Sequence, residues 1–182
     1  MSNIAVIYHS GYGHTTKQAE AVAKGAKADL IAIDANGDIT DADWAKLDAA
    51  KAIIFGSPTY MGGASWQFKK FADASSKKWF TQEWKNKIFA GFTNSATMNG
   101  DKFSTIQYFV TLAMQHSGVW VGTGLMPANT KAAKHGDVNF VGGFGGALMT
   151  SPSDSSPDEV NKGDLETARL LGARVAEFAA KA

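Results

Sequence analysis

The fold is decided by the stretch Ile4-Ala5-Val6-Ile7-Tyr8-His9-Ser10-Gly11-Tyr12-Gly13-His14-Thr15-Thr16. Its first five residues are all apolar, which predicts a strand buried on both faces of a parallel sheet. Residues His9–Thr16 are rich in hydroxyl groups and glycine and predict a loop. A helical pattern of alanine and valine follows, at Ala19, Val22, Ala23 and Ala26. A strand, such a loop and a helix in this order predict a pocket for a phosphate group.

The donors of this loop are electrically neutral. Glycines let the backbone curl so that several N–H groups converge, and the first helical turn adds unpaired N–H donors and the positive end of its dipole. Hydroxyl groups are available from Ser10, Thr15 and Thr16, whereas no Lys or Arg lies between His9 and Thr16. This donor set favours a tightly kept cofactor phosphate.

Three interpretations of the loop remain open on its residues alone. It is a mononucleotide phosphate site, the start of a dinucleotide fingerprint, or a structural turn. Asp34 stands about 20 residues further on, where a ribose-binding acid belongs, but Thr16 replaces the third glycine of that fingerprint. A nucleoside-triphosphate loop is excluded because no Gly-Lys-Ser/Thr follows.

Composition limits the function classes. The chain has 182 residues, 45% of them hydrophobic and 19% charged, and we expect residues 1–182 to form a single domain. A net charge of +1 gives no electrostatic case for nucleic acid and argues against an acidic electron shuttle that docks by charge. Without cysteine there is no redox dithiol, so electron chemistry would require a bound cofactor.

The chain carries no targeting or membrane signal that we can identify. It lacks the basic stretch and apolar core of a signal peptide, and no apolar span reaches about 18 residues. We therefore expect a cytoplasmic protein without membrane insertion.

Apolar runs alternate with helical patterns along the whole chain. Five runs are continuously apolar and predict strands: Ile4–Tyr8, Leu30–Ile33, Ala52–Phe55, Ile88–Phe92 and Val119–Val121. Crossover helices between them specify an α/β, doubly wound parallel sheet. The last helix has two candidate starts, at Ser156 and at Asn161. The glycine-rich stretch from Gly122 to Ser155 is expected to be irregular and to fold over the site or an interface.

Ligands of such sheets bind at the carboxyl ends of the strands, where the strand order reverses. Three segments rich in Gly, Ser, Thr and Asn fall at such ends: Ser10–Thr15, Ser57–Gly63 and Thr93–Gly100. In the second segment, Tyr60 and Met61 suit packing on an aromatic ring system. A loop packed only for its own stability is the alternative.

Together these loops resemble a known family. The chain is similar to the WrbA-type flavodoxin-like NAD(P)H:quinone oxidoreductases, within the FMN-binding flavodoxin superfamily. The resemblance covers nearly the whole length, and the matching segments are Tyr8–Thr15, Gly56–Gly62, Phe92–Thr97, Gln115–Gly118 and Gly142–Ala147. It implies a flavodoxin-like five-stranded sheet in the order 2-1-3-4-5, with helices on both faces.

The resemblance also implies the site. Residues Ser10 to Thr15 would hold the FMN phosphate, Tyr60, Met61 and Gly62 would border the isoalloxazine ring, and Asn94 to Asn99 would line its other side. The implied cofactor-binding residues are Ser10, Gly11, Tyr12, Gly13, His14, Thr15, Pro58, Thr59, Tyr60, Met61, Gly62, Asn94, Ser95, Ala96, Thr97, Met98, Asn99 and His116.

The resemblance further implies roles in the reaction. His116 would lie at the ring, and either His116 or Tyr60 would orient the acceptor or relay a proton. Tyr12 matches a position tied to nicotinamide binding, and Trp79 one at the substrate face. From the residues alone, a single histidine is more often structural, and Trp79 could equally be a core or interface aromatic.

The implied activity is FMN-dependent hydride transfer from NADH or NADPH to a quinone or similar small-molecule acceptor. The alternatives are a flavodoxin-like electron carrier and a flavin-dependent binding module. The resemblance also implies a homodimer or homotetramer, and from the sequence we expect no nucleic-acid partner and no metal. Asp34–Thr40 imitates a calcium loop, but Ile39 and Ala45 stand where the loop needs Gly and Glu.

Overall fold

The computed structural model describes residues 4–181. The strands are β1 Ile4–Tyr8, β2 Asp29–Ala32, β3 Ala52–Tyr60, β4 Gly63–Ala64, β5 Ile88–Ser95, β6 Val119–Trp120 and β7 Ala147–Thr150. The helices are α1 His14–Ala26, α2 Asp41–Ala49, α3 Trp66–Ala74, α4 Ser76–Phe80, α5 Lys102–Gln115 and α6 Lys162–Ala179, with a 3₁₀ turn η1 at Pro157–Glu159. Each predicted apolar run lies in or overlaps a strand of one sheet.

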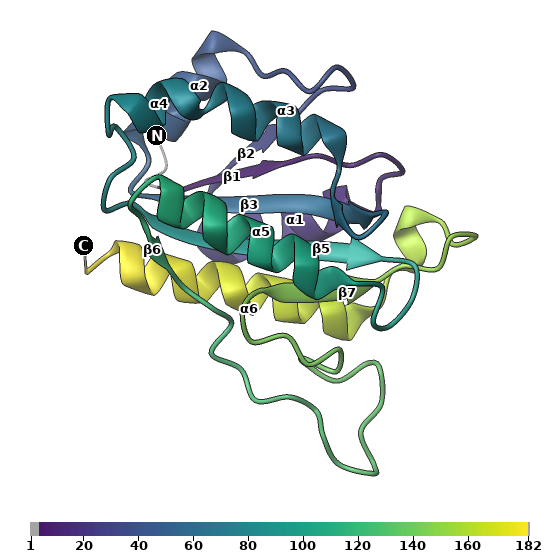
Figure 1. The fold of residues 1–182 in the computed structure, drawn as a ribbon. Helices are drawn as coiled ribbons and strands as arrows, with labels where there is room; N and C mark the ends of the chain where they lie inside the picture. Colours follow the sequence, from purple (N-terminus) through teal and green to yellow (C-terminus); the bar gives the residue numbers. More distant parts are fainter. Residues whose placement is uncertain (1–3, 182) are drawn as a thin grey trace.

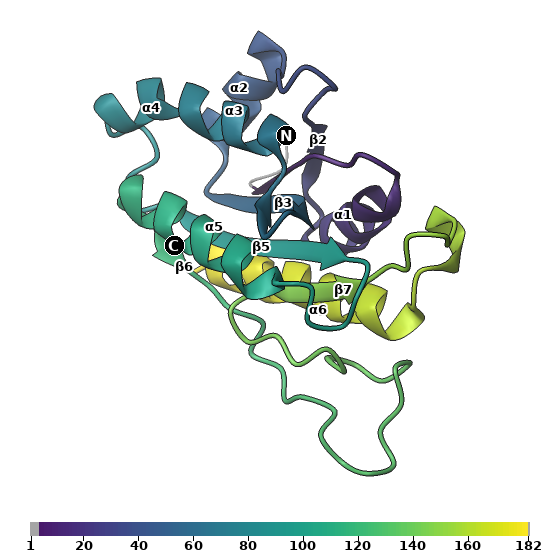
Figure 2. The same cartoon turned by 45° about the vertical axis from the view of Figure 1, so that its right-hand side comes forward.

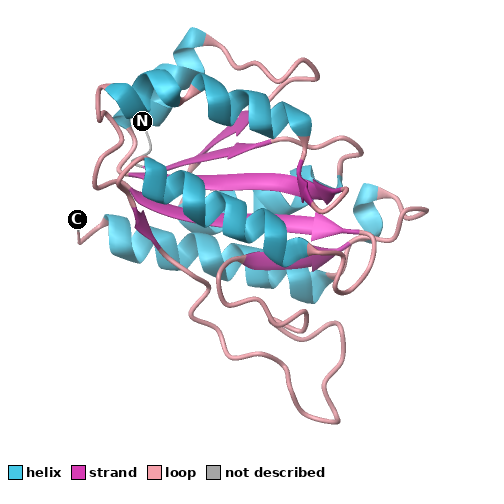
Figure 3. Ribbon diagram, viewed as in Figure 1, coloured by secondary structure: helices cyan, strands magenta, loops and turns pink. Residues whose placement is uncertain are grey.

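The sheet has the strand order β2-β1-β3-β5-β6, and these neighbours are parallel. Counted over the five predicted strands, this is the order 2-1-3-4-5, so the predicted flavodoxin-like topology is confirmed. Helices cover both faces of the sheet (Figures 1 and 3). The order reverses between β1 and β3, which places a ligand crevice at the carboxyl ends of these two strands.

The fifth position of the sheet is divided between two strands. β6 pairs with the start of β5, at Ile88 and Phe89, whereas β7 pairs with its second half, Phe92–Ser95. The intervening residues form a long loop that projects from the sheet (Figure 2). The expectation that Gly122–Ser155 is irregular throughout is therefore wrong at β7, which forms through pairing with the distant β5.

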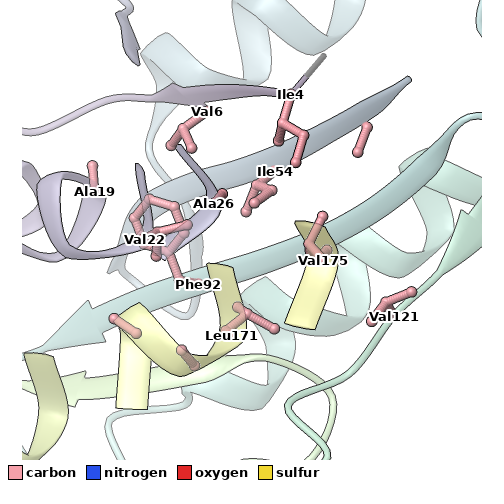
Figure 4. Close-up of a cluster of buried hydrophobic side chains, with 14 of the residues drawn as sticks. Ile4, Val6, Ala19, Val22, Ala26, Ile54, Phe92, Val121, Leu171 and Val175 are labelled. Atoms are coloured by element: carbon pink, nitrogen blue, oxygen red, sulfur yellow. The ribbon is translucent and has the colours of Figure 1, made fainter. Parts of the chain in front are cut away.

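Two hydrophobic cores lie on opposite faces of the sheet. Alternate residues of each strand point to opposite sides, so Val6 packs toward α1 and α6 while Ile7 packs toward α2, α3 and α5. Figure 4 shows the first core, in which Val22 of α1 and Leu171 of α6 meet the sheet. Burial of one such side chain contributes roughly 1.5–3 kcal/mol. Together the two cores fix the strand ends rigidly.

Helices α1 and α6 approach closely through two glycines. A Cβ added at Gly172 would lie 2.1 Å from the Val22 carbonyl oxygen, and one at Gly25 would lie 1.9 Å from the Arg169 carbonyl oxygen. Both obstacles are backbone atoms of the facing helix, which cannot rotate away. Glycine at these positions therefore sets the distance between the two helices.

Replacing Gly172 with alanine is expected to lower the free energy of unfolding by about 2 kcal/mol, because overpacking outweighs the roughly 1 kcal/mol gained in helix propensity. Guanidinium denaturation measures this change. Gly136→Ala is the control, since no atom lies within 4 Å of its added Cβ. A Gly172→Ala protein as stable as the wild type would contradict this account of the packing.

No helix within residues 4–181 is both long enough and apolar enough to cross a membrane.

Candidate functional site

The loop between β1 and α1 is organised by Ser10. Its Oγ accepts hydrogen bonds from the backbone N–H groups of Gly13, at 3.0 Å, and Thr16, at 3.3 Å. Gly13 takes the left-handed conformation, with φ 90°, where glycine carries no steric penalty. Because both bonds are accepted by Oγ, the Ser10 hydroxyl hydrogen stays available to an acceptor outside the loop.

The first turn of α1 contains no acidic side chain. Its N–H groups and the helix dipole therefore meet no competing carboxylate there, which suits an incoming anion.

Strand β3 continues further than the sequence predicts. Residues Ser57–Tyr60 were expected to be a loop after the strand, but they extend β3, and Ser57 and Pro58 pair with Thr93 and Asn94 of β5. The Gly56 carbonyl accepts from His9 N–H on the β1 side, and backbone direction alternates along a strand. Pro58 thus faces the side where β1 has ended, so no ladder bond is lost by its missing N–H.

Tyr60 lies directly over the first loop. A Cβ on Gly11 would come within 2.7 Å of the Tyr60 hydroxyl oxygen, so only glycine allows this approach. The rings of Tyr12 and Tyr60 pack edge to face, with centroids 6.3 Å apart. Burial raises the pKa of Tyr60, with a further rise from Tyr12 and an opposing hydrogen bond from the Gly11 amide. Tyr60 therefore keeps its hydroxyl hydrogen at neutral pH.

Met61 and Gly62 form the tip of a hairpin between β3 and β4. Both have positive φ, 47° and 80°, and the flanking Tyr60 and Gly63 pair with each other. This is the arrangement of a two-residue type I′ turn. Nothing lies within 4 Å of a Cβ added at Gly62. The turn by itself accounts for a glycine at position 62.

Asn94 joins three segments of the site. Thr15 Oγ1 donates to Asn94 Oδ1 at 2.6 Å, and Asn94 Nδ2 donates to Ser151 Oγ at 2.8 Å. All three residues are buried. The first loop, the end of β5 and the segment after β7 are therefore held in one arrangement. Since the Thr15 hydroxyl hydrogen is committed to Asn94, Thr15 has only its backbone N–H to offer a phosphate.

Three buried threonines connect the two strands that border the site to helix α5 through their hydroxyl groups. Thr93 Oγ1 donates to the Ser57 carbonyl at 2.6 Å, so the 2.8 Å contact with Thr59 must be donated by Thr59. Thr105 of α5 in turn donates to Thr59 at 2.8 Å. This directed chain of hydroxyl groups fixes the ends of β3 and β5 relative to α5.

These segments enclose a pocket of about 390 Å³, within the roughly 300–1,000 Å³ typical of small-molecule sites. Its walls combine aromatic rings with hydroxyl and amide groups. The lining residues are Tyr12, His14, Thr59, Tyr60, Asn94, Ser95, Ala96, Ser151 and Ser153. Seven of these were predicted from the sequence, so the structure brings the three predicted loops together.

Sequence reasoning missed Ser151 and Ser153. They follow β7, whose existence depends on pairing with β5. The segment is further tied to the site because His14 Nε2 donates to the Ser155 carbonyl at 2.9 Å. The run Ser151–Ser156, dense in serine after a short apolar stretch, was the signal available in the sequence.

His116 and Trp79 are not part of this pocket. Helix α5 runs antiparallel to the strands, and its 14 residues carry the chain about 21 Å from the third loop to the start of β6. The last turn of α5 lies at that far end (Figure 1), and His116, the residue that follows it, lines a separate groove of about 290 Å³ together with Trp79. The prediction that His116 lies at the ring is therefore wrong for a ligand held by the loops of the same chain, and Trp79 likewise does not line their pocket.

His116 is instead a buried structural residue. Ser75 Oγ donates to the Ala72 carbonyl at 2.7 Å, so the 2.9 Å contact with His116 is donated by His116 Nε2–H. The imidazole packs against Trp84, with ring centroids 4.6 Å apart. Burial lowers the pKa of His116 from 6.5 to about 4.

Because the folded pKa of His116 is depressed, the unfolded chain binds a proton more readily as the pH falls. Stability should decrease from about pH 6.5 to about pH 4, by about 3 kcal/mol from this residue. His116→Phe is expected to flatten this dependence, which thermal unfolding across that pH range measures. The account fails if the wild type and the variant show the same pH slope.

The lysines of α3 and α4 are mostly neutralised by acids. Lys69 pairs with Asp73 at 2.5 Å, and Lys70 pairs with Asp38 at 2.7 Å. Lys78 bonds Asp48 at 2.7 Å as well as a second carboxylate. This helix face therefore presents little net positive charge to a nucleotide phosphate.

The acidic turn after β2 binds its own backbone. Asp34 Oδ1 accepts from the N–H groups of Asn36, at 2.8 Å, and Asp38, at 2.9 Å. These bonds lower the pKa of Asp34, and the bond from the Asp38 N–H contributes most. Over residues 4–181, no cluster of three or more His, Cys, Asp or Glu side chains is arranged to hold a metal ion.

Comparison with known proteins agrees with this geometry. The family model described as NADPH-dependent FMN reductase matches residues 13–132. The chain is 54% identical to flavodoxin FldP of Pseudomonas aeruginosa (strain UCBPP-PA14), over 98% of this chain and 97% of that protein. It is 32% identical to an NAD(P)H dehydrogenase (quinone) of Rhizobium rhizogenes, over 100% of this chain and 98% of that protein.

A solved structure extends the likeness to three dimensions. The crystal structure of the flavodoxin, WrbA-like protein from Agrobacterium tumefaciens superposes with a TM-score of 0.83 at 54% identity. The match covers 100% of this chain and 99% of that one. A flavodoxin from the domain Archaea, 21% identical with a TM-score of 0.61, shares the fold.

Proposed function

The chain belongs to the NADPH-dependent FMN reductase family, in its WrbA-type flavodoxin-like branch, and on this premise we propose that it is an FMN-dependent oxidoreductase. It would transfer reducing equivalents from NADH or NADPH to a quinone or similar small acceptor. The observation that carries the proposal is the convergence of three neutral, donor-rich strand ends on one pocket at the point where the strand order reverses.

The residues present fit FMN. A phosphate monoester needs several convergent donors. The first loop offers the Ser10 hydroxyl hydrogen, since Ser10 Oγ already accepts from Gly13 and Thr16, and it offers the N–H groups of the first turn of α1. A planar ring needs flat apolar walls with polar groups at the edge. Tyr12 and Tyr60 supply the rings, and Asn94 with Ser95 supplies the polar edge.

Bound FMN would supply the redox chemistry. The chain's own residues would bind the cofactor, orient it and shield it from solvent. Ser10 and the α1 amides would hold the phosphate, while Asn94 keeps the loops in register through Thr15 and Ser151. Tyr60, whose pKa lies above its usual range, would retain the hydroxyl hydrogen and donate it to an acceptor atom. Tyr12, exposed at the mouth of the pocket, would give a nicotinamide ring a surface on which to stack.

The proposal is tested by measuring whether the protein catalyses NAD(P)H oxidation. Purified protein loaded with FMN should oxidise NADPH or NADH in the presence of benzoquinone, at a rate proportional to protein concentration. Tyr12→Ala should raise KM for the nicotinamide, measured with the variant saturated with FMN because Tyr12 also forms part of the proposed flavin wall. A protein that binds FMN but shows only background NAD(P)H oxidation would overturn the enzymatic proposal and leave FMN binding intact.

A second candidate is an electron carrier that passes single electrons to protein partners. The relative that favours it is named a flavodoxin and shares 54% of its residues with this chain. Chemically reduced protein would then pass electrons to cytochrome c without NAD(P)H oxidation. The net charge of +1 weighs against charge-guided docking of such a carrier.

The predicted homodimer or homotetramer remains a prediction, which light scattering would test.

A further inference from the structure

A buried lysine lies beneath the third loop. Lys102 opens helix α5, and only 1% of its surface is exposed. Its ammonium group donates to the carbonyl oxygens of Thr97, at 2.6 Å, and Met98, at 3.1 Å. These carbonyls belong to the loop that follows β5 and borders the pocket. The charge therefore acts on the backbone of the loop.

This position is unfavourable for a lysine. The first turn of a helix carries the positive end of the dipole, which repels a cation. Burial also lowers the pKa of Lys102 to about 8. An apolar side chain of similar length would fill the space without either cost. The packing of α5 alone does not explain a lysine here.

The chain reverses just before Lys102. Gly100 and Asp101 both have positive φ, 50° and 52°, and Lys102 N–H donates to the Asn99 carbonyl at 3.2 Å. A Cβ on Gly100 would clash with Ser95 Oγ at 1.9 Å, so glycine is required in this turn. The two left-handed residues bring the Lys102 side chain back under the loop.

The two carbonyl bonds determine where the loop amides point. A trans peptide holds its C=O and the next N–H in opposite directions, and residues 4–181 contain only trans peptides. Inward carbonyls at Thr97 and Met98 therefore turn the N–H groups of Met98 and Asn99 outward. Neither N–H donates a hydrogen bond to any group in the described part of the chain.

We propose that Lys102 is a positioning residue that presents the Met98 and Asn99 amides as a pair of donors to the acceptor-rich edge of the flavin ring. The proposal rests on FMN being the ligand. It assigns the third loop a backbone role: the carbonyls bind the lysine and the amides bind the ligand. The loop side chains are then free to vary.

One acid supports this lysine. Asp164, at the start of α6, favours the charged form of Lys102. It is 1% exposed, and its Oδ2 accepts from Thr150 N–H and from His135 Nε2, both at 3.0 Å. Asp164 is the titratable group of α6 that acts on Lys102, and His135 of the long loop binds to Asp164.

The experiment compares two lysines of the same kind. Lys87 also donates its ammonium hydrogens to backbone carbonyls, those of Leu47, Asp48 and Ala50, and burial lowers its pKa as well. It lies just before the amino end of β5, away from the pocket. Lys102→Met should weaken FMN binding by about tenfold, the loss of roughly one good hydrogen bond. Lys87→Met should leave FMN affinity unchanged.

FMN affinity is measured by quenching of FMN fluorescence from pH 6.5 to 9.5. The affinity of the wild type for FMN should fall as Lys102 loses its proton above about pH 8. The affinity of Lys102→Met should not show this decrease. Carbon-13 shifts of the Thr97 and Met98 carbonyls, followed by NMR without ligand, should move with the same midpoint. They should also move in Lys102→Met and stay fixed in Lys87→Met.

Equal FMN affinity in wild type and Lys102→Met, or an equal loss in Lys87→Met, would overturn this inference and leave the proposed function standing. Carbonyl shifts that ignore Lys102→Met would overturn it too. A wild-type protein that does not bind FMN would overturn the proposed function and this inference with it.

Discussion

Replacing Ser10 with aspartate is expected to weaken FMN binding at least a hundredfold while leaving the protein as stable as the wild type, or slightly more so. The carboxylate can accept the same backbone bonds from Gly13 and Thr16 that Ser10 Oγ accepts. It also lies at the amino end of α1, where a negative charge stabilises a helix by about 0.3–1 kcal/mol.

The same charge opposes a phosphate. Two like charges about 4 Å apart interact by roughly 4 kcal/mol at an effective dielectric constant of about 20. Isothermal titration measures the affinity, and thermal unfolding measures the stability. Ser10→Asn, which is nearly the same size and uncharged, should bind FMN within a few fold of the wild type. If Ser10→Asp bound FMN as tightly as the wild type, the phosphate would lie elsewhere.

Asn94→Leu should have the largest effect on the architecture of the site. The leucine removes both bonds of Asn94 and leaves the hydroxyl groups of Thr15 and Ser151 buried without these partners. Each such group costs about 1–3 kcal/mol, so the free energy of unfolding should fall by about 2–5 kcal/mol. FMN affinity should fall as well, because the first loop and the segment after β7 lose their common anchor.

The matched control is Asn99→Leu in the same loop. The Asn99 side chain is exposed, so this change should alter stability by less than about 0.5 kcal/mol. Denaturant titration of both variants gives the comparison. A similar small effect for Asn94→Leu would show that the Thr15–Asn94–Ser151 link does not hold the site together.

The strands were predictable because burial on both faces leaves a local trace. Residues Ile4–Tyr8 and Ala52–Phe55 are continuously apolar, and both form central strands. Capping chemistry is equally local. Of the two predicted starts of the last helix, Asn161 is the one that caps α6, by accepting from Gly163 N–H, whereas Ser156 forms a capping box on the separate turn η1.

Long-range pairing left no such trace. Strand β7 is four residues long and follows glycines, so the short apolar stretch Ala147–Thr150 does not by itself predict a strand. It is a strand because Phe92–Ser95 offers it an unpaired edge. The extension of β3 through Pro58 has the same origin, since only the early end of β1 makes a proline acceptable there.

The site was predictable where position follows from topology. Strand carboxyl ends converge in any doubly wound sheet, which correctly grouped Tyr12, Tyr60 and Asn94 around one pocket. His116 was misplaced because a crossover helix returns the chain to the amino edge of the sheet. Lys102 was not predicted as a site residue. Its proposed role depends on the directions of the Thr97 and Met98 carbonyl groups, which only the folded loop shows.

The most direct test of the whole account is a fluorescence titration of FMN with the ligand-free protein, run beside riboflavin. The account predicts saturable quenching with a micromolar or lower Kd for FMN, and weaker binding of riboflavin, since the phosphate contacts are missing. Unquenched FMN at tens of micromolar protein, or equal affinity for FMN and riboflavin, would contradict a phosphate cradle at the end of β1.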